Sequence, residues 1–358
     1  MHEEQPKGPL RYFAAAVMAL VLCTTAALAV ENGERSLIPV GHTVGVKLFS
    51  RGVVVVKLPE GTTPARACGL KTGDVILECG GESVTSTEQF QSLLQENGTE
   101  ATELAIKRDG SAMTLSVEPE RNDAGVYCIG AWIRDSMAGI GTVTYYDPET
   151  RTFGALGHGI TDGDTAALMP FGSGAILAST VKAVKKGGTG SAGELRGDFD
   201  LSGDVGTLYA NTSCGIFGTV TADCPLTCGE CVPAAEPKAG PAVIRANVAG
   251  DAVEEYTVEI LKVLPGAADG REMVLSVTDP ALIAATGGIV QGMSGSPILQ
   301  DGKLVGAVTH VLLSYKGLSA DLFENLKSSF QNYLQKPLFY CMKKQKIPMY
   351  LPQRQKAY

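Results

Sequence analysis

The candidate nucleophile of this chain is Ser294, which lies in the stretch GMSGSPI at residues 292–298. Gly292 and Gly295 bracket it, and glycine permits the sharp backbone turn that aims a hydroxyl outward. Serine between glycines is also ordinary turn chemistry, so a catalytic interpretation needs support from other residues. Of the two serines in the stretch, Ser294 is the predicted nucleophile and Ser296 is expected to support the turn.

A hydroxyl is a poor nucleophile unless a general base lies within hydrogen-bond reach. The chain has four histidines. His2 precedes a long apolar segment, His42 opens a separate small domain, and His310 falls on the strand after the serine turn, in the core or the pocket wall. His158 lies in GALGHGITD, where the flanking glycines leave a side chain accessible. His158 is therefore the predicted base, by elimination and context.

A carboxylate that orients the imidazole and stabilises its cation would complete the constellation. Asp162 is only four residues from His158, and Asp301 is used by a turn. Asp279 ends a β run 15 residues before Ser294. On local grounds Asp279 is equally suited to cap the following ALIAAT segment or to begin a turn, and the sequence leaves these alternatives open.

Backbone amides at the serine turn could supply an oxyanion hole. Glycine at position 292 lets N–H groups converge on one point, and the candidate donors are Ser294 together with Gly292 or Met293. Losing one such donor typically costs about 3–4 kcal/mol of transition-state stabilisation. This chemistry requires no metal and no cofactor, and none is expected.

The region that positions these residues, 121–318, is expected to be mostly β because short Val, Ile and Thr runs alternate with glycine. Two β runs follow the serine turn and are joined by Asp301-Gly302, a strong hairpin signal. Residues 147–150 form the predicted turn of an earlier hairpin. The Gly-rich segment 185–204 is expected to be a loop flanking a short strand, and its DFDLSGD lacks the full ligand set of a calcium loop.

A smaller domain is predicted at residues 41–120. Two β-rich runs split at 50–52 open it, a helix is predicted over 85–95, and two alternating strands joined by Arg-Asp-Gly at 108–110 close it. This order resembles a PDZ domain, and GLKTGDVILECGGESV (69–84) is similar to PDZ segments attached to exported bacterial proteases.

The PDZ resemblance implies a carboxylate-binding loop at Val44, Gly45, Val46 and Lys47. Free amides there would lie beside an exposed strand edge, to which a peptide C-terminus or an extended peptide could add as a further strand. The alternative is a PDZ domain that serves only as a packing module.

The N-terminal 30 residues predict export. Residues 1–11 form a basic, cytoplasmic n-region, and 12–30 contain no charge and end near Ala27-Leu28-Ala29, a possible cleavage site. The apolar stretch suits either a removed signal peptide or a retained membrane anchor. A linker at 31–40 follows.

The composition is that of a globular chain. Its 358 residues are 44% hydrophobic, which allows two or three domains, and the formal net charge of −8 argues against nucleic-acid binding. Four of the nine cysteines cluster at 214, 224, 228 and 231. They could hold zinc, form two disulfides or stay free, and export favours a local disulfide over the metal because no histidine lies nearby.

The C-terminal segment 319–358 has a different character. Apolar positions at helical spacing predict a helix over 319–334, and a basic tail follows. This tail could contact anionic lipid or remain solvated.

Long strings extend the resemblance to a family. GAWIRDSMAGIGTVTYYDPETRTFGALGHGITD (130–162), GELRGDF (193–199), NTSCGIFG (211–218) and TGGIVQGMSGSPILQDGKLVGAVTHV (286–311) resemble the stage IV sporulation protein B peptidases. With the PDZ region, the resemblance covers roughly residues 38–312.

The family resemblance implies a trypsin-like double β-barrel with His158 as base, Asp279 as orienting carboxylate and Ser294 as nucleophile. It also implies a peptidase exported into the space around the forespore, which cleaves itself near its N-terminus. A membrane-bound regulator is its other implied substrate, and that cleavage releases an intramembrane protease that activates a late sigma factor.

The C-terminus departs from the family, which normally continues past the THV motif with a strand pair that closes the second barrel. Here residues 319–358 stand in that place. This departure motivates the competing hypothesis of a catalytically impaired scaffold that binds membrane partners through its PDZ domain.

Overall fold

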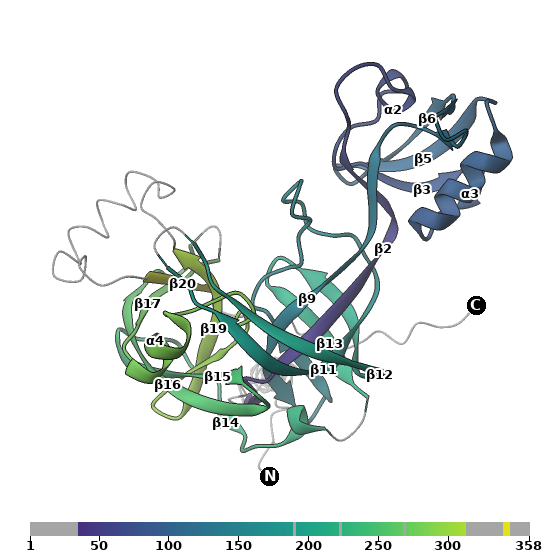
Figure 1. Ribbon diagram of the computed structural model, residues 1–358. Helices are drawn as coiled ribbons and strands as arrows, with labels where there is room; N and C mark the ends of the chain where they lie inside the picture. Colours follow the sequence, from purple (N-terminus) through teal and green to yellow (C-terminus); the bar gives the residue numbers. More distant parts are fainter. Residues whose placement is uncertain (1–34, 189–190, 222–223, 268–269, 313–338, 344–358) are drawn as a thin grey trace, which may run out of the picture. The chain divides into compact units, whose positions relative to one another are not determined.

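The computed structural model describes residues 35–188, 191–221, 224–267, 270–312 and 339–343 (Figure 1). The predicted signal or anchor segment at 12–30 and the predicted helix at 319–334 lie outside these residues. The chain divides into two units, Met1–Ser36 and Leu37–Tyr358, and the fold described below lies in the second. No helix in the described part is long and apolar enough to cross a membrane.

The PDZ domain is built from short strands and one well-capped helix. Its elements are α2 (Pro64–Ala67), β3 (Val75–Cys79), β4 (Glu82–Ser83), α3 (Thr87–Asn97), β5 (Thr102–Arg108) and β6 (Ser111–Val117), followed by the β7 (Glu120–Arg121) and β8 (Tyr127–Cys128) pair. Ser86 caps α3 by accepting a hydrogen bond from the Gln89 amide, which fixes the start of the helix predicted over 85–95. The predicted closing hairpin is confirmed as β5 and β6.

Two long strands belong to both domains: β2 (Thr43–Lys57) and β9 (Trp132–Asp147). The sequence predicts two separate β runs split at 50–52, and this expectation is wrong because β2 continues through the split. Gly52 takes a φ of +84°, and the pairing with β9 shifts register between Phe49 and Val54. A bulge of this kind lets a strand bend without ending, so the first half of β2 belongs to the first of two barrels and the second half belongs to the PDZ domain.

The first barrel is a closed ring of six strands. Its order is β9–β10–β13–β12–β11–β2, and the β2–β9 pairing closes it. The further members are β10 (Thr152–Ala155), β11 (Phe171–Lys185), β12 (Glu194–Thr212) and β13 (Gly215–Val220). The hairpin predicted around 147–150 is confirmed as β9 and β10. The segment 185–204 is more regular than expected, because the 19-residue β12 begins at Glu194.

The second barrel is closed in the order β15–β16–β17–β20–β19–β18. These strands are β15 (Gly240–Ala249), β16 (Ala252–Val263), β17 (Met273–Val277), β18 (Pro297–Gln300), β19 (Lys303–Leu312) and β20 (Phe339–Lys343), with helix α4 (Pro280–Thr286) after β17. β20 pairs with both β17 and β19. The C-terminal segment, which departs from the family pattern, therefore supplies the strand that closes this barrel.

Three short elements complete the described fold: β1 (Ser36–Pro39), the 3-10 helix η1 (Pro225–Thr227) and β14 (Val232–Pro233). Separate apolar cores fill the PDZ domain and the two barrels, around Phe90, Phe153 and Ile244 respectively. The fold class predicted from the sequence, a PDZ domain followed by a double β-barrel, is confirmed.

Candidate active site

His158 and Ser294 share one cleft of about 460 Å³. The first barrel supplies its His158 side and the second barrel supplies the serine turn. The other lining residues are mostly small or apolar: Val46, Met137, Ala138, Gly139, Ile140, Leu156, Gly159, Ile160, Thr161, Glu194, Leu195, Gln291 and Gly292. The fold therefore brings together the predicted nucleophile and the predicted base from positions 136 residues apart (294 − 158).

The serine turn is held by Thr142 of β9. The Thr142 amide donates to the carbonyl oxygen of Ser294 at 2.9 Å, and its hydroxyl donates to the carbonyl oxygen of Gly292 at 2.7 Å. Gly295 takes a φ of +101°, and its amide donates to the carbonyl oxygen of Val308 at 2.7 Å. One strand of each barrel thus fixes the turn, and the positive φ explains why glycine occupies this position.

The hydroxyl of Ser294 donates to the carbonyl oxygen of Thr309 at 3.2 Å. A serine hydroxyl has a single proton to donate. While that proton is directed at Thr309 it is not available to an imidazole, so transfer to a base requires the O–H bond to turn away from the Thr309 carbonyl oxygen.

The imidazole of His158 has its Nδ1 atom 2.9 Å from the carbonyl oxygen of Gly159. Since a carbonyl only accepts hydrogen bonds, this contact places the proton on Nδ1 and leaves Nε2 as the proton acceptor. The ring centroid of His158 lies 5.5 Å from that of His310, with the two planes tilted by 52°. His310 is exposed and is not among the residues that line the cleft, so it lies beside His158 without the core or pocket-wall location that its strand position predicts.

The loop that carries His158 is fastened by Asn211, a residue that sequence reasoning missed. Its Oδ1 accepts from the Ile160 amide at 2.8 Å, and its Nδ2 donates to the carbonyl oxygens of Ile160 and Met169, both at 3.0 Å. The only sequence signal was the position of Asn211 in the string NTSCGIFG. The role of Asn211 depends on three hydrogen bonds between its side chain and backbone groups of the loop, and these can be identified only once the loop conformation is known.

Asp279 is not among the described residues that line the cleft. Its Oδ1 accepts from the amides of Ala281 and Leu282 at the start of α4, and its Oδ2 accepts from the amide of Thr257 at 3.3 Å. Burial would raise the pKa of this carboxyl, but the hydrogen bonds from Leu282, Thr257 and Ala281 outweigh it and lower the pKa. Of the alternatives that the sequence left open, the helix cap is the one present in this structure.

The amides at the serine turn are not equivalent. The Met293 amide donates to the carbonyl oxygen of Val290 at 3.1 Å, and the Met293 side chain is fully buried. Within the described residues, the amides of Gly292 and Ser294 have no protein acceptor. Gly292 and Ser294 are therefore the available oxyanion donors, and Met293 is not.

Val44, Gly45, Val46 and Lys47 do not form a carboxylate-binding loop. They lie within β2, which pairs along this stretch with β9 on one edge and with β11 on the other. Pairing on both edges leaves no free strand edge for a peptide. The prediction is wrong because these residues belong to the first peptidase barrel, where Val46 lines the cleft of His158 and Ser294.

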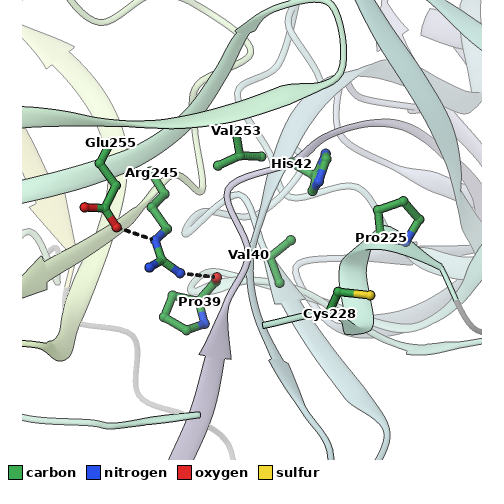
Figure 2. Close-up of a pocket in the computed structure, with 8 residues that line it drawn as sticks. All are labelled: Pro39, Val40, His42, Pro225, Cys228, Arg245, Val253 and Glu255. Atoms are coloured by element: carbon green, nitrogen blue, oxygen red, sulfur yellow. Dashed lines mark hydrogen bonds and ion pairs between the residues drawn. The ribbon is translucent and has the colours of Figure 1, made fainter. Parts of the chain in front are cut away.

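The clustered cysteines at 214, 224, 228 and 231 form no disulfide within the described residues, so the local disulfide that the sequence favours is not present. No group of three or more His, Cys, Asp or Glu residues in the described ranges could hold a metal ion. A further pocket of about 550 Å³ lies beside this cluster (Figure 2). In it Arg245 donates to Glu255 at 2.9 Å and to the carbonyl oxygen of Pro39 at 3.2 Å, so its guanidinium is already paired. This pocket contains neither His158 nor Ser294.

Comparison with known families supports the arrangement of domains. Residues 125–319, more than half of the chain, match the SpoIVB peptidase S55 family, and residues 56–108 match a PDZ domain family. The chain belongs to the SpoIVB peptidase S55 family. Membership of the S55 family, with this double barrel and cleft, supports a serine peptidase.

Curated relatives match over shorter stretches. Zinc metalloprotease RasP of Oceanobacillus iheyensis is 34% identical over 62 residues, which are 17% of this chain and 15% of that protein. Serine protease HTRA1 of Xenopus tropicalis is 37% identical over 71 residues, which are 20% of this chain and 15% of that protein. The chain thus spans about 15% of the length of these two relatives.

Among solved structures, the PDZ domain of an SdrC-like protein from Listeria monocytogenes matches with 20% identity and a TM-score of 0.22. The matched region covers 23% of this chain and 87% of the Listeria chain.

Proposed function

We propose that the chain is a serine endopeptidase in which Ser294 is the nucleophile and His158 is the general base. The observation that carries the proposal is the cleft between the two barrels, which is lined by both side chains. Ser294 lies there on a turn framed by glycines, and the contact of His158 Nδ1 with the Gly159 carbonyl oxygen makes Nε2 the proton acceptor of the neutral ring.

The mechanism follows from these positions. The Ser294 oxygen attacks the peptide carbonyl carbon while its proton passes to Nε2 of His158. The amides of Gly292 and Ser294 stabilise the resulting oxyanion. Collapse of the tetrahedral intermediate breaks the peptide C–N bond, and the leaving amine takes the proton from His158. Water then hydrolyses the acyl-enzyme by the reverse sequence of proton transfers.

Orientation of the imidazole is assigned to the carbonyl oxygen of Gly159 in this mechanism. That contact holds the tautomer that a carboxylate holds in a Ser-His-Asp triad. Asp279, the carboxylate that the family resemblance implies, stabilises α4 instead in this arrangement. Substrate binding is expected to rotate the Ser294 hydroxyl from Thr309 toward His158, since catalytic hydrogen bonds often tighten only in the complex.

The biological role proposed is signalling during sporulation. Family membership and the basic, apolar N-terminal segment support an exported peptidase that acts around the forespore. The proposed substrates are the chain itself, near its N-terminus, and a membrane-bound regulator of an intramembrane protease that activates a late sigma factor. The PDZ domain supports binding of protein or peptide partners.

The test uses the purified full chain with a fluorophosphonate probe and an assay of self-cleavage. The wild-type chain is expected to be labelled at Ser294 and to process itself, and Ser294→Ala is expected to lose both properties. Processing of Ser294→Ala at the wild-type rate would exclude Ser294 as the nucleophile.

A non-catalytic scaffold is the competing function. The hydrogen bond from the Ser294 hydroxyl to Thr309 and the engagement of both Asp279 oxygens favour it. The same probe separates the two functions, because a scaffold whose serine is not activated is left unlabelled while its PDZ domain still binds partners.

A further inference from the structure

Strand β9 runs beside both the PDZ helix α3 and the cleft of the proposed peptidase. Arg134 and Asp135 are neighbours in β9, and successive side chains of a strand point to opposite faces of the sheet. Their hydrogen bonds therefore reach different parts of the molecule. Arg134 bonds to the loop that carries His158, and Asp135 bonds to the first residue of α3.

The Arg134 guanidinium forms two ion pairs with the loop that follows His158. One guanidinium nitrogen donates to the carboxylate of Asp162, and the other donates to Asp164 Oδ2 at 2.9 Å. The Asp162 side chain is only 1% exposed, while that of Arg134 is 33% exposed. A buried carboxylate that loses its cationic partner is left uncompensated, so this contact constrains the loop strongly.

Asp162 organises the loop that follows His158. Its second carboxylate oxygen accepts from the amides of Asp164 and Thr165 at 3.0 and 2.9 Å. Its own amide and carbonyl pair with Ala167 and Ala166 at 2.8 Å. Burial would raise the pKa of Asp162, but the hydrogen bonds from Thr165 and Asp164 and the Arg134 charge lower it. Asp162 is therefore a charged anchor, and Arg134 ties it to β9.

Asp135 makes the corresponding contact with the PDZ domain. Its Oδ2 accepts from the Thr87 amide at 2.8 Å and from the Thr87 hydroxyl at 3.0 Å. Thr87 is the first residue of α3, where backbone amides lack intrahelical acceptors and a negative charge is favourable. The Ser136 hydroxyl fixes the other Asp135 oxygen at 2.8 Å.

We propose that Arg134 is a positioning residue for His158, and that Arg134 and Asp135 together couple the PDZ helix α3 to the catalytic loop. A peptide that displaces α3 would move Asp135, and the adjacent Arg134 would transmit the change to Asp162 and His158. Thermodynamic linkage requires the reverse as well, so that occupancy of the cleft changes α3. The effect on catalysis rests on the proposed function, whereas the coupling itself rests on the contacts of Arg134 and Asp135 in β9.

The first arm of the experiment measures the rate of fluorophosphonate labelling against pH in the full chain. The Arg134→Gln variant is expected to be labelled at least tenfold more slowly than the wild-type chain, and the acidic side of its rate-against-pH curve is expected to shift. The Arg134→Lys variant is expected to recover part of the rate. Arg121→Gln is the matched control, because Arg121 is exposed and stacks on Tyr127. Labelling of Arg134→Gln at the wild-type rate with an unchanged pH profile would overturn the positioning role.

The second arm does not depend on activity. Hydrogen exchange is measured in Asp135→Asn and in Asp123→Asn, an exposed control. The Asp135 side chain contacts Thr87 and its neighbour Ser136 but not the histidine loop, yet Asp135→Asn is expected to speed exchange of the Asp162 and Ala166 amides several-fold. Exchange that rises only around Thr87 would refute the coupling. If the wild-type chain were unlabelled while this coupling was present, the proposed function would fail and the coupling would stand.

Discussion

The Ser294 hydroxyl and the Thr309 carbonyl oxygen are joined by a hydrogen bond of 3.2 Å. Thr309 precedes His310, whose ring lies 5.5 Å from that of His158. The Ser294 turn is therefore tied to the strand that carries His310, whose ring neighbours the imidazole of the proposed base. The following predictions test what this arrangement requires of each residue.

The two serines of the turn are expected to respond in opposite ways. Ser294→Ala removes the proposed nucleophile and should abolish fluorophosphonate labelling, and loss of the hydrogen bond to Thr309 should lower the free energy of unfolding by about 1 kcal/mol. The Ser296 hydroxyl is buried and has no partner among the described residues, so Ser296→Ala should keep the activity and raise the free energy of unfolding by about 1 kcal/mol. Labelling rates and urea unfolding of the two variants check this, and loss of labelling in Ser296→Ala would contradict it.

Gly295→Ala is expected to be strongly destabilising. A Cβ at this position would overlap the Thr142 carbonyl oxygen and lie 2.6 Å from the Leu156 amide nitrogen, at a φ of +101°. The cost should exceed about 3 kcal/mol in unfolding free energy, since strain alone contributes about 1–3 kcal/mol. Gly302→Ala is the control, because its positive φ is the same kind of strain but its Cβ meets open space. Equal losses in the two variants would argue against the clash.

Substitutions of Asp279 distinguish a helix cap from a catalytic carboxylate. Asn caps helices about as well as Asp, so Asp279→Asn should retain both stability and labelling. Asp279→Ala should lose about 1 kcal/mol of unfolding free energy through the cap of α4. If Asp279 oriented the imidazole, its amide variant would lower kcat by about four orders of magnitude. Labelling kinetics of both variants decide between these roles.

Stability is expected to fall between about pH 7 and pH 5 in part through His42. Burial lowers the pKa of His42 below its ordinary value, although the Asp251 charge opposes this. As the pH falls through the unfolded-state pKa of about 6.5, the unfolded chain gains a proton that the folded chain does not, which favours unfolding. His42→Gln should make the urea midpoint less dependent on pH over this window. A pH dependence equal to that of the wild-type chain would show that His42 does not contribute.

Local signals in the sequence were sufficient for the elements that depend on neighbouring residues. Ser86 at the start of α3 and the Asp-Gly turn at 301–302 act within a few residues, so their patterns predict the helix and the hairpin directly. The glycines around Ser294 predict a tight turn for the same reason.

The pairing of strands that are distant in the sequence could not be predicted from local residue patterns. The β pattern of Val44 to Lys47 is the same for an edge strand of a PDZ domain and for a strand inside a barrel. Only the pairing of β2 with β9 and β11 shows that these residues belong to the barrel. Likewise β20 closes the second barrel from a tail whose composition predicts no particular partner.

The sequence by itself therefore determined the fold class and the family, and it predicted Ser294 and His158 as the chemical pair that the cleft brings together. The tertiary structure alone decided what holds them: Thr142 under the serine turn, Asn211 and Arg134 behind the histidine loop, and Asp279 at a helix cap instead. The physical reason is that a side chain's hydrogen bonds depend on which distant backbone groups the fold brings within about 3 Å of it, and residue spacing does not encode that distance.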